Sequence, residues 1–192
     1  GRVYTPDYIV NLILDFGGYN SSEILKKHVI DNSCGDGAFL VEIVNRYCST
    51  FLQTSNDISL LREELETYIH GIELDEVECK SCIKNLHQIT DKYGVKDINW
   101  NILNADTLTI DQFNGKMDFV FGNPPYVRVH NLETSYDSVK KFKFAKDGMT
   151  DLFIVFFEIG FKMLAKEGVM CLITPSSWLS SLAGKTLREY IF

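Results

Sequence analysis

Residues 28–40, HVIDNSCGDGAFL, decide the fold class of this chain. The apolar run at 28–32 has the length of a buried strand, and Phe39 and Leu40 open a pattern of helical spacing that continues to Tyr47. A glycine turn therefore leads directly from a strand into a helix. Glycines let a ligand approach the backbone closely, and the first turn of a helix presents unpaired amides to a carboxylate or phosphate. We expect a ligand site at this turn.

Four further runs of strand length alternate with helical segments along the chain. They occupy residues 68–74, 99–104, 118–121 and 169–174. Alternation of short apolar strands with amphipathic helices is typical of a parallel sheet that is covered on both faces. We predict a Rossmann-like α/β fold with a mostly parallel sheet in the order 3-2-1-4-5 and a ligand at the carboxyl ends of strands one to three.

The composition is that of one ordinary globular domain: 192 residues, 45% hydrophobic and 23% charged. No run approaches the ~18 apolar residues of a membrane span, and residues 1–10 lack the pattern of a signal peptide, so we expect a cytoplasmic protein without a membrane partner. The five cysteines lack the second close pair of a zinc site, and we expect reduced thiols and no metal. A net charge of -7 argues against a chain that grips a phosphate backbone by itself.

Two acidic residues are expected on the same rim as the glycine turn. Glu73 lies at the end of the second predicted strand, where a carboxylate can bind two ribose hydroxyls. Asp106 follows the third predicted strand and could accept a hydrogen bond from an adenine amino group. The turn contains Gly35 and Gly37, but Leu40 stands where the dinucleotide fingerprint has its third glycine, which argues against a nicotinamide enzyme.

The most specific segment is GNPPY at residues 122–126, where the fourth predicted strand ends. A proline fixes its own backbone and restricts the residue before it, so Pro124 and Pro125 make a rigid support for Asn123. The Asn123 side-chain oxygen and the Pro124 carbonyl could accept both hydrogens of a planar amine, turning the nitrogen lone pair toward a methyl donor; this effect grows in the transition state. Tyr126 offers a flat face for an extruded base. We predict that these four residues are catalytic.

Seven segments occur in the order that a known family shows. They are YTP (4–6), DNSCGDGAFL (31–40), GIELD (71–75), NADTL (104–108), GNPPY (122–126), DLFIVFFE (151–158) and GVMCLITPSSWL (168–179). With them the chain resembles, over nearly its whole length, the gamma-type N6-adenine DNA methyltransferases of bacterial restriction-modification systems. The resemblance implies an S-adenosylmethionine-dependent methyltransferase fold, S-adenosyl-L-methionine as the cofactor, and methyl transfer to the N6 amino group of adenine in DNA.

The resemblance also implies which residues bind the cofactor. Thr5 and Pro6 belong to a segment that folds against the cofactor, and Thr5 would contact its methionine end. The other implied residues are Asp31, Cys34, Gly35 and Gly37 along the methionine, Glu73 at the ribose, and Asp106 and Phe156 at the cofactor adenine.

Three positions and the end of the chain depart from the family pattern. Asn32 and Ser33 stand where the family usually has Pro and Ala, and Asp36 stands where it has a small neutral residue. An acid at position 36 would repel the methionine carboxylate unless it points outward. The family fold has two further strands and a target recognition domain beyond Phe192. We therefore expect residues 1–192 to be a catalytic-domain fragment that binds DNA weakly alone and whose exposed sheet edge invites self-association.

The connection 127–150 is long for a compact domain and could work as a binding loop. It interleaves basic and aromatic side chains: Arg128, Tyr136, Lys140, Lys141, Phe142, Lys143, Phe144 and Lys146. Contact with nucleic acid and an ordinary solvated loop both fit this composition.

Other functions remain open at this point. The same Asn-Pro-Pro-Tyr segment would serve any planar amine, including a glutamine side chain in a protein or a guanine amine in RNA. The Thr-Pro segment and the DLF segment favour adenine in DNA. A catalytically silent interaction module is a further alternative, against which the intact Asn-Pro-Pro-Tyr segment and the two acids argue.

Overall fold

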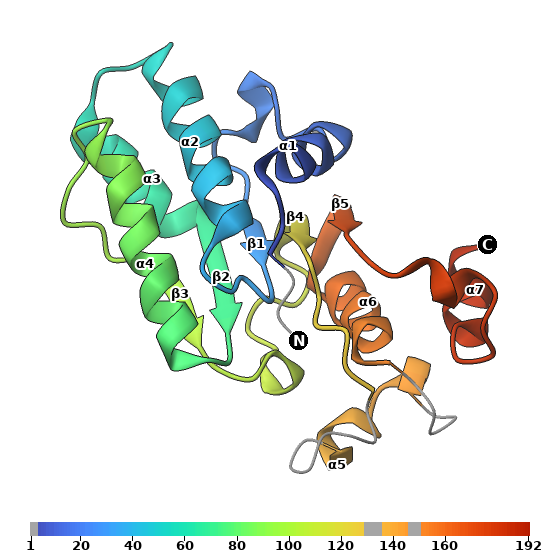
Figure 1. Ribbon diagram of the computed structural model, residues 1–192. Helices are drawn as coiled ribbons and strands as arrows, with labels where there is room; N and C mark the ends of the chain where they lie inside the picture. Colours follow the sequence, from blue (N-terminus) through green and yellow to red (C-terminus); the bar gives the residue numbers. More distant parts are fainter. Residues whose placement is uncertain (1–3, 129–135, 146–150) are drawn as a thin grey trace.

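A five-stranded parallel sheet forms the centre of the protein (Figure 1). The computed structural model describes residues 4–128, 136–145 and 151–192. The strands are β1 (Val29–Asp31), β2 (Ile69–Glu73), β3 (Asn101–Asn104), β4 (Met117–Gly122) and β5 (Leu164–Leu172). Every neighbouring pair is parallel, and the order is β3-β2-β1-β4-β5. The predicted fold class and strand order are confirmed.

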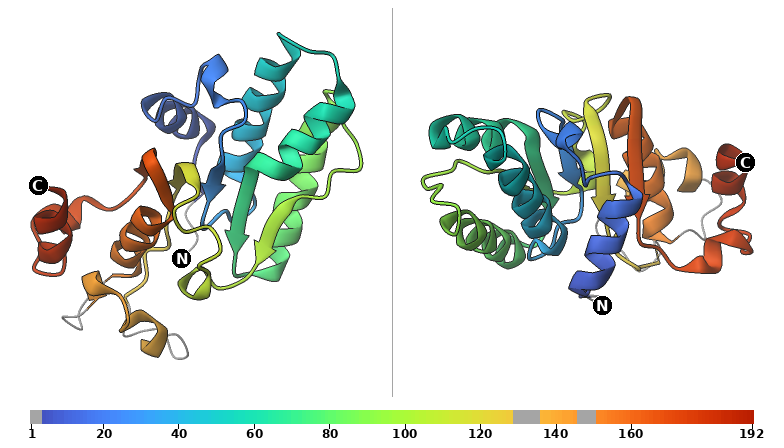
Figure 2. Two further views of the ribbon diagram at one scale, coloured as in Figure 1. Left: turned by 180° about the vertical axis from the view of Figure 1, so that it is seen from behind. Right: turned by 90° about the horizontal axis from the view of Figure 1, so that it is seen from above.

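Helices cover both faces of this sheet (Figure 2). One layer consists of α1 (Asp7–Phe16), α2 (Ala38–Leu52), α3 (Ile58–Tyr68) and α4 (Glu76–Asp91). The other contains α6 (Leu152–Met163), with α5 (Tyr136–Val139) and α7 (Lys185–Ile191) beside it. Short 3-10 turns are η1 (Ser22–Ile24), η2 (Thr107–Thr109), η4 (Lys143–Ala145) and η5 (Ser176–Leu179).

Successive residues of the central strand pack against opposite layers, because side chains alternate along a strand. Val29 belongs to an apolar cluster with Leu40 of α2 and Leu86 of α4. Ile30 belongs to another cluster with Val155 of α6. The central strand β1 is thus buried on both faces, as is typical of a parallel sheet between two helical layers.

Neither α1 nor α3 is predicted from the sequence. In α1, Val10 and Leu14 are buried, but Tyr8, Leu12 and Phe16 are exposed. At 10 residues, α1 is shorter than the window of about 11 residues over which helical periodicity is recognised, and exposed apolar side chains lie beside its buried pair.

The edge strand β5 begins at Leu164 rather than at residue 169 and ends at Leu172. Its register against β4 shifts, because Met117 pairs with Leu164 whereas Phe119 pairs with Val169. Within this irregularity Glu167 has a positive φ of 65°. The sequence prediction missed the first part of the strand because a bulge is tolerated at a sheet edge without the alternation that marks a regular strand.

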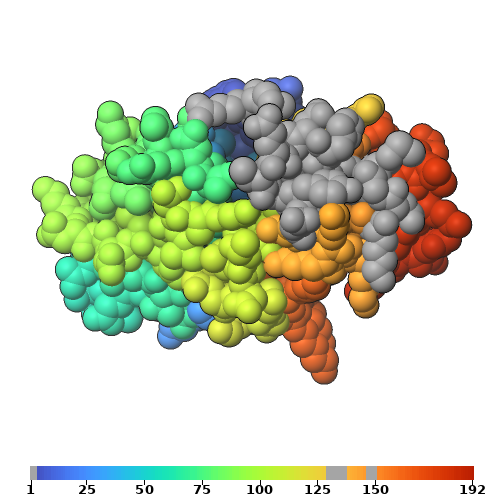
Figure 3. Space-filling view, turned by 90° about the horizontal axis from the view of Figure 1, so that it is seen from below, coloured from blue at the N-terminus to red at the C-terminus, as the bar shows by residue number. Residues whose placement is uncertain are grey.

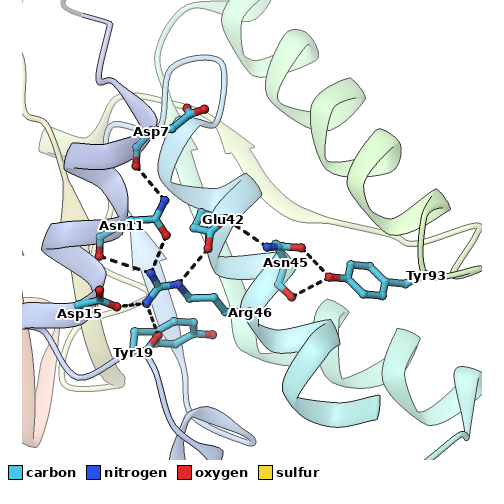
Figure 4. A network of polar contacts seen from close by, with 8 residues as sticks. All are labelled: Asp7, Asn11, Asp15, Tyr19, Glu42, Asn45, Arg46 and Tyr93. Atoms are coloured by element: carbon cyan, nitrogen blue, oxygen red, sulfur yellow. Dashed lines mark hydrogen bonds and ion pairs between the residues drawn. The ribbon is translucent and has the colours of Figure 1, made fainter. Parts of the chain in front are cut away.

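Arg46 of α2 ties α1 to the rest of its layer (Figure 4). Its guanidinium donates to the side chains of Asp15 (2.7 Å), Asn11 (2.8 Å) and Glu42 (3.0 Å), and to the carbonyl of Tyr19 (3.0 Å). The Arg46 side chain is only 15% exposed, so solvent screens these charge-assisted bonds less than it screens a surface pair. The arginine thereby holds the beginning of the described chain against α2.

Two negative findings apply to the described part of the chain. None of its helices is long and apolar enough to cross a membrane. No group of three or more His, Cys, Asp or Glu side chains is arranged there to hold a metal ion. The five cysteines are free thiols.

Candidate active site

A cavity of about 550 Å³ opens at the carboxyl ends of the strands. All strands of a parallel sheet end at the same edge, so the turns that follow them meet there. The lining residues are Tyr4, Asn32, Ser33, Gly35, Asp36, Ile72, Glu73, Leu74, Glu78, Asp106, Thr107, Leu108, Asn123, Pro124, Pro125, Tyr126, Val127, Leu152 and Phe156. The volume is within the range of small-molecule and cofactor sites.

The glycine turn after β1 is fixed by backbone hydrogen bonds, both within the turn and to β2. The Cys34 amide donates to the Ile72 carbonyl (3.0 Å), and the Gly37 amide donates to the Cys34 carbonyl (2.8 Å). Gly35 and Gly37 have φ of 54° and 94°, in the left-handed region that favours glycine. A Cβ at Gly37 would lie 2.8 Å from the Sγ of Cys82, so the close packing of the turn on α4 also requires glycine there.

Two carboxylates in the cavity wall are oriented by backbone amides. Glu73 accepts hydrogen bonds from the amides of Gly35 and Asp75, both at 2.8 Å. Asp106 accepts one from the amide of Leu108 (3.0 Å) and thereby caps η2. A carboxylate has about four acceptor positions, so each group keeps capacity for a ligand donor. The two predicted acids therefore line one cavity.

Asp31 is buried beside the site and does not line the cavity. Its side chain is 2% exposed, and its Oδ1 accepts a hydrogen bond from the Ser33 amide (3.0 Å). Burial raises the pKa of this carboxyl to about 7; the bond from Ser33 opposes the rise, and the negative charge of Glu73 adds to it. Asp31 is therefore a carboxyl that changes its charge near neutral pH.

The amide of Asn123 is held on both sides. Its Nδ2 donates to the Oγ1 of Thr5 (3.1 Å), and its Oδ1 accepts from the hydroxyl of Tyr126 (2.5 Å). The Tyr126 ring packs edge-on against Phe153 of α6, with the ring centroids 6.2 Å apart. Burial raises the pKa of the Tyr126 phenol, which therefore keeps the proton that it donates.

The predicted site residues fall into two groups. The cavity wall contains Gly35, Glu73, Asp106, Asn123, Pro124, Pro125, Tyr126 and Phe156. Outside the wall lie Thr5, Pro6, Asp31, Cys34 and Gly37. The second group supports the first: Thr5 holds the Asn123 amide, and Pro6 and Gly37 precede the first residues of α1 and α2.

The lining residues that are not predicted as site residues include Tyr4, Asn32 and Ser33. The Oδ1 of Asn32 and the Oγ of Ser33 are buried and have no hydrogen-bond partner among the described residues. Leaving a buried polar atom unpaired costs roughly 1 to 3 kcal/mol, so these two atoms favour a polar partner, either an ordered water or a polar ligand group. The sequence offered one sign that Asn32 and Ser33 belong to the site: both are polar at positions where the family that the chain resembles has apolar residues.

A smaller cavity of about 320 Å³ adjoins the first, between the N-terminal segment, α2 and α4. Tyr4 and Asp36 line both cavities. The Asn85 side chain of α4 donates to the Asp36 carbonyl (2.9 Å) and fixes this part of the turn. Asp36 thus lies between the two cavities, at the position where the resemblance implies a neutral residue.

For two of its three aromatic residues, the nucleic-acid interpretation of residues 127–150 is wrong. Phe142 and Phe144 are only 4% and 6% exposed and pack in the apolar clusters around α6, so neither ring is available to a nucleic acid. The exposed members of the set are basic: Arg128, Lys140, Lys141 and Lys143. Figure 3 shows the segment 136–145 in orange beside the yellow-green segment that includes η2. Lys146 and the side chain of Tyr136 lie outside the described residues.

Comparison with known proteins assigns the family. The model of the Eco57I restriction-modification methylase matches residues 38–192, a range that includes both cavity acids and the whole Asn-Pro-Pro-Tyr segment. The chain belongs to the Eco57I restriction-modification methylase family. This Eco57I-family chain is 31% identical over 204 residues to the Type II methyltransferase M.BstVI of Geobacillus stearothermophilus, and the match covers 100% of the chain and 36% of M.BstVI. It spans about a third of the length of M.BstVI and of two further Type II methyltransferases that it matches, M.PaeR7I and M.XhoI.

Solved structures share the fold of this Eco57I-family chain. A putative class I S-adenosylmethionine-dependent methyltransferase from Listeria monocytogenes superposes with a TM-score of 0.69 at 16% identity, over 97% of this chain and 51% of that one. DrdV in complex with DNA superposes with a TM-score of 0.72 at 19% identity, over 98% of this chain and 22% of that one. At these identities the likeness shows a common methyltransferase fold.

Proposed function

We propose that the protein containing this chain transfers a methyl group from S-adenosyl-L-methionine to the N6 amino group of adenine in DNA, within a bacterial restriction-modification system. One observation carries the proposal: Glu73, bonded to the glycine turn, and Asn123 line the same cavity. The first offers acceptors to a nucleoside, and the second offers an acceptor to a planar amine. A cofactor and its target can therefore be bound in one cavity.

The chemistry of the cavity wall fits this cofactor. Glu73 suits the ribose hydroxyls, and Asp106 suits an adenine amino group, because ionised carboxylates only accept hydrogen bonds. The unpaired atoms of Asn32 and Ser33 suit the polar methionine end. Phe156 supplies an apolar surface for a purine ring. When bound, S-adenosylmethionine supplies an electrophilic methyl group.

Asn123 acts on the target side. The amino group of adenine is a weak nucleophile because its lone pair is delocalised into the ring. Asn123 Oδ1 and the Pro124 carbonyl accept the two amino hydrogens, draw the nitrogen toward a tetrahedral shape and stabilise the positive charge that develops on it. Tyr126 offers its ring to the flipped base, a contact worth about 1 to 3 kcal/mol.

The comparisons support DNA as the substrate. M.BstVI is a Type II methyltransferase, and DrdV was solved on DNA. Membership in a restriction-modification family favours DNA over a protein glutamine or an RNA guanine amine. We propose adenine because GNPPY and its companion segments resemble those of the N6-adenine enzymes, and we propose the bacterial cytoplasm as the place of action.

Identification of the methylated nucleoside tests the proposal. The full-length protein is incubated with unmethylated DNA and S-adenosylmethionine, and the DNA is digested to nucleosides for mass spectrometry. The expected product is N6-methyl-2′-deoxyadenosine. Methylated cytosine in the DNA would contradict the proposal. So would methylation of protein or RNA, supplied in parallel reactions, when the DNA is left unmethylated.

A further inference from the structure

We propose that Thr5 is a positioning residue for Asn123, a role that rests on the proposed function of the same site. The Oγ1 of Thr5 accepts a 3.1 Å hydrogen bond from the Nδ2 of Asn123, 118 positions away in the sequence. Thr5 is 6% exposed and does not line the cavity, whereas Asn123 does. The threonine therefore acts from behind the cavity wall on the residue that would contact the target amine.

The contact orients an asymmetric group. An asparagine amide has one accepting end and one donating end, and only the accepting end can bind the hydrogens of an amine. With Nδ2 bonded to Thr5, Oδ1 lies toward Tyr126, which is itself a lining residue. Rotation of the amide by half a turn would present two N–H donors to an amine that also donates. Thr5 thus stabilises the orientation that catalysis requires.

Thr5 and Asn123 are each adjacent to an element of the folded core. Thr5 lies just before α1, and Asn123 follows β4. Pro6 precedes α1, and its carbonyl accepts the amides of residues 9 and 10. The other end of α1 packs on β4, because a Cβ at Gly17 would overlap the ring of Phe121. β4 ends at Gly122, immediately before Asn123, and Arg46 ties α1 to α2. Both partners of the bond are therefore held by packed elements.

This role differs from the one that the family resemblance implies for the same residue. A threonine in contact with the methionine end would affect cofactor affinity. A threonine that orients Asn123 would affect the methyl-transfer step, because the amide contacts the target amine. The two roles therefore predict changes in different quantities, cofactor affinity and kcat, which can be measured separately.

The test uses the full-length protein and the variants Thr5→Val, Thr5→Ser and Asn123→Ala. Valine keeps the shape of threonine and removes the acceptor, whereas serine keeps the acceptor. Thr67→Val is the matched control, because Thr67 is exposed on α3 and its hydroxyl donates to the Glu63 carbonyl of the same helix. Three readouts are kcat at saturating substrates, S-adenosylmethionine affinity by calorimetry, and solvent exchange of the Asn123 side-chain amide by NMR after selective asparagine labelling.

We expect Thr5→Val to lower kcat by about 3- to 10-fold, the effect of one neutral hydrogen bond, and to leave cofactor affinity within about twofold. Amide exchange at Asn123 should accelerate, and Thr5→Ser should restore both kcat and exchange. Weaker cofactor binding with an unchanged kcat, or unchanged kcat and exchange, would overturn the inference. The exchange readout does not depend on methylation, so retained activity in Asn123→Ala would refute the proposed function while the orientation of the amide is still tested.

Discussion

The amide of Gly35 donates a 2.8 Å hydrogen bond to Oε2 of Glu73, which joins the turn after β1 to the end of β2. The other oxygen of the same carboxylate accepts the amide of Asp75. One acidic side chain therefore both shapes the glycine turn and presents acceptors to the cavity. Its removal should disturb ligand binding in two ways, by loss of the direct contact and by loosening of the turn.

Replacement of Glu73 by alanine should weaken S-adenosylmethionine binding by about 10- to 150-fold, because a charge-assisted hydrogen bond contributes roughly 1.5 to 3 kcal/mol. Isothermal titration calorimetry measures this directly. Glu63→Ala, an exposed change on α3, serves as the control and should leave the affinity unaltered. Equal affinities for the wild type and Glu73→Ala would refute the assignment of the ribose to this carboxylate.

Asp31 should make the stability of the folded protein fall as pH rises toward neutrality. Its folded-state pKa is about 7 against an ordinary value of 3.8, so between these values the folded protein holds a proton that the unfolded chain has released. Stability associated with this proton is present at low pH and is lost as pH rises through 7. Asp31→Asn should therefore exceed the wild type in stability at pH 8 by on the order of a few kcal/mol, at about 1.4 kcal/mol per pKa unit.

Urea denaturation between pH 4 and pH 8 tests this pH dependence. The difference between Asp31→Asn and the wild type should widen with pH, whereas Asp111→Asn, at an exposed position, should follow the wild type. A constant difference across the range would show that Asp31 is already ionised in the folded protein at low pH.

The two glycines of the turn should respond unequally to alanine. Both have a positive φ, but a Cβ at Gly35 meets nothing within 4 Å, whereas one at Gly37 meets Cys82 Sγ at 2.8 Å. Gly35→Ala should cost about 1 to 2 kcal/mol of unfolding free energy for the left-handed backbone alone. Gly37→Ala should cost more, and Cys82→Ala in the same chain should recover part of the loss. Equal costs in urea denaturation would show that the turn does not pack tightly on α4.

Alone, the 192-residue chain should bind duplex DNA weakly and should self-associate. Its net charge of -7 opposes a phosphate backbone despite the exposed Lys140, Lys141 and Lys143, so we expect a dissociation constant weaker than roughly 10 µM at physiological salt. The outer edge of β5 has no partner strand in the described sheet and could pair with another copy. Sedimentation velocity with labelled duplex measures DNA binding and self-association in one experiment. Tight DNA binding would contradict the first expectation, and a strictly monomeric chain would contradict the second.

The sequence predicted those parts of the site that depend on strand ends. Glu73, Asp106 and Asn123 each follow an apolar run, and topology then brings them to one rim. The bond from Asn123 to Thr5 was not predictable, since it joins residues 118 apart through the packing of an unpredicted helix. The burial of Phe142 and Phe144 was also not predictable. A short segment with two aromatic residues has the same local sequence pattern whether its rings are buried or exposed.

The central claim is that Asn123 acts on the target amine, and a single substitution tests it most directly. In the full-length protein, transfer of tritium-labelled methyl groups to DNA is compared between the wild type, Asn123→Ala and the control Asn114→Ala, which lies in an exposed turn. Asn123→Ala should abolish transfer while calorimetry shows unchanged cofactor affinity, because the lost acceptor acts on the target amine. Transfer by Asn123→Ala at close to the wild-type rate would contradict the account.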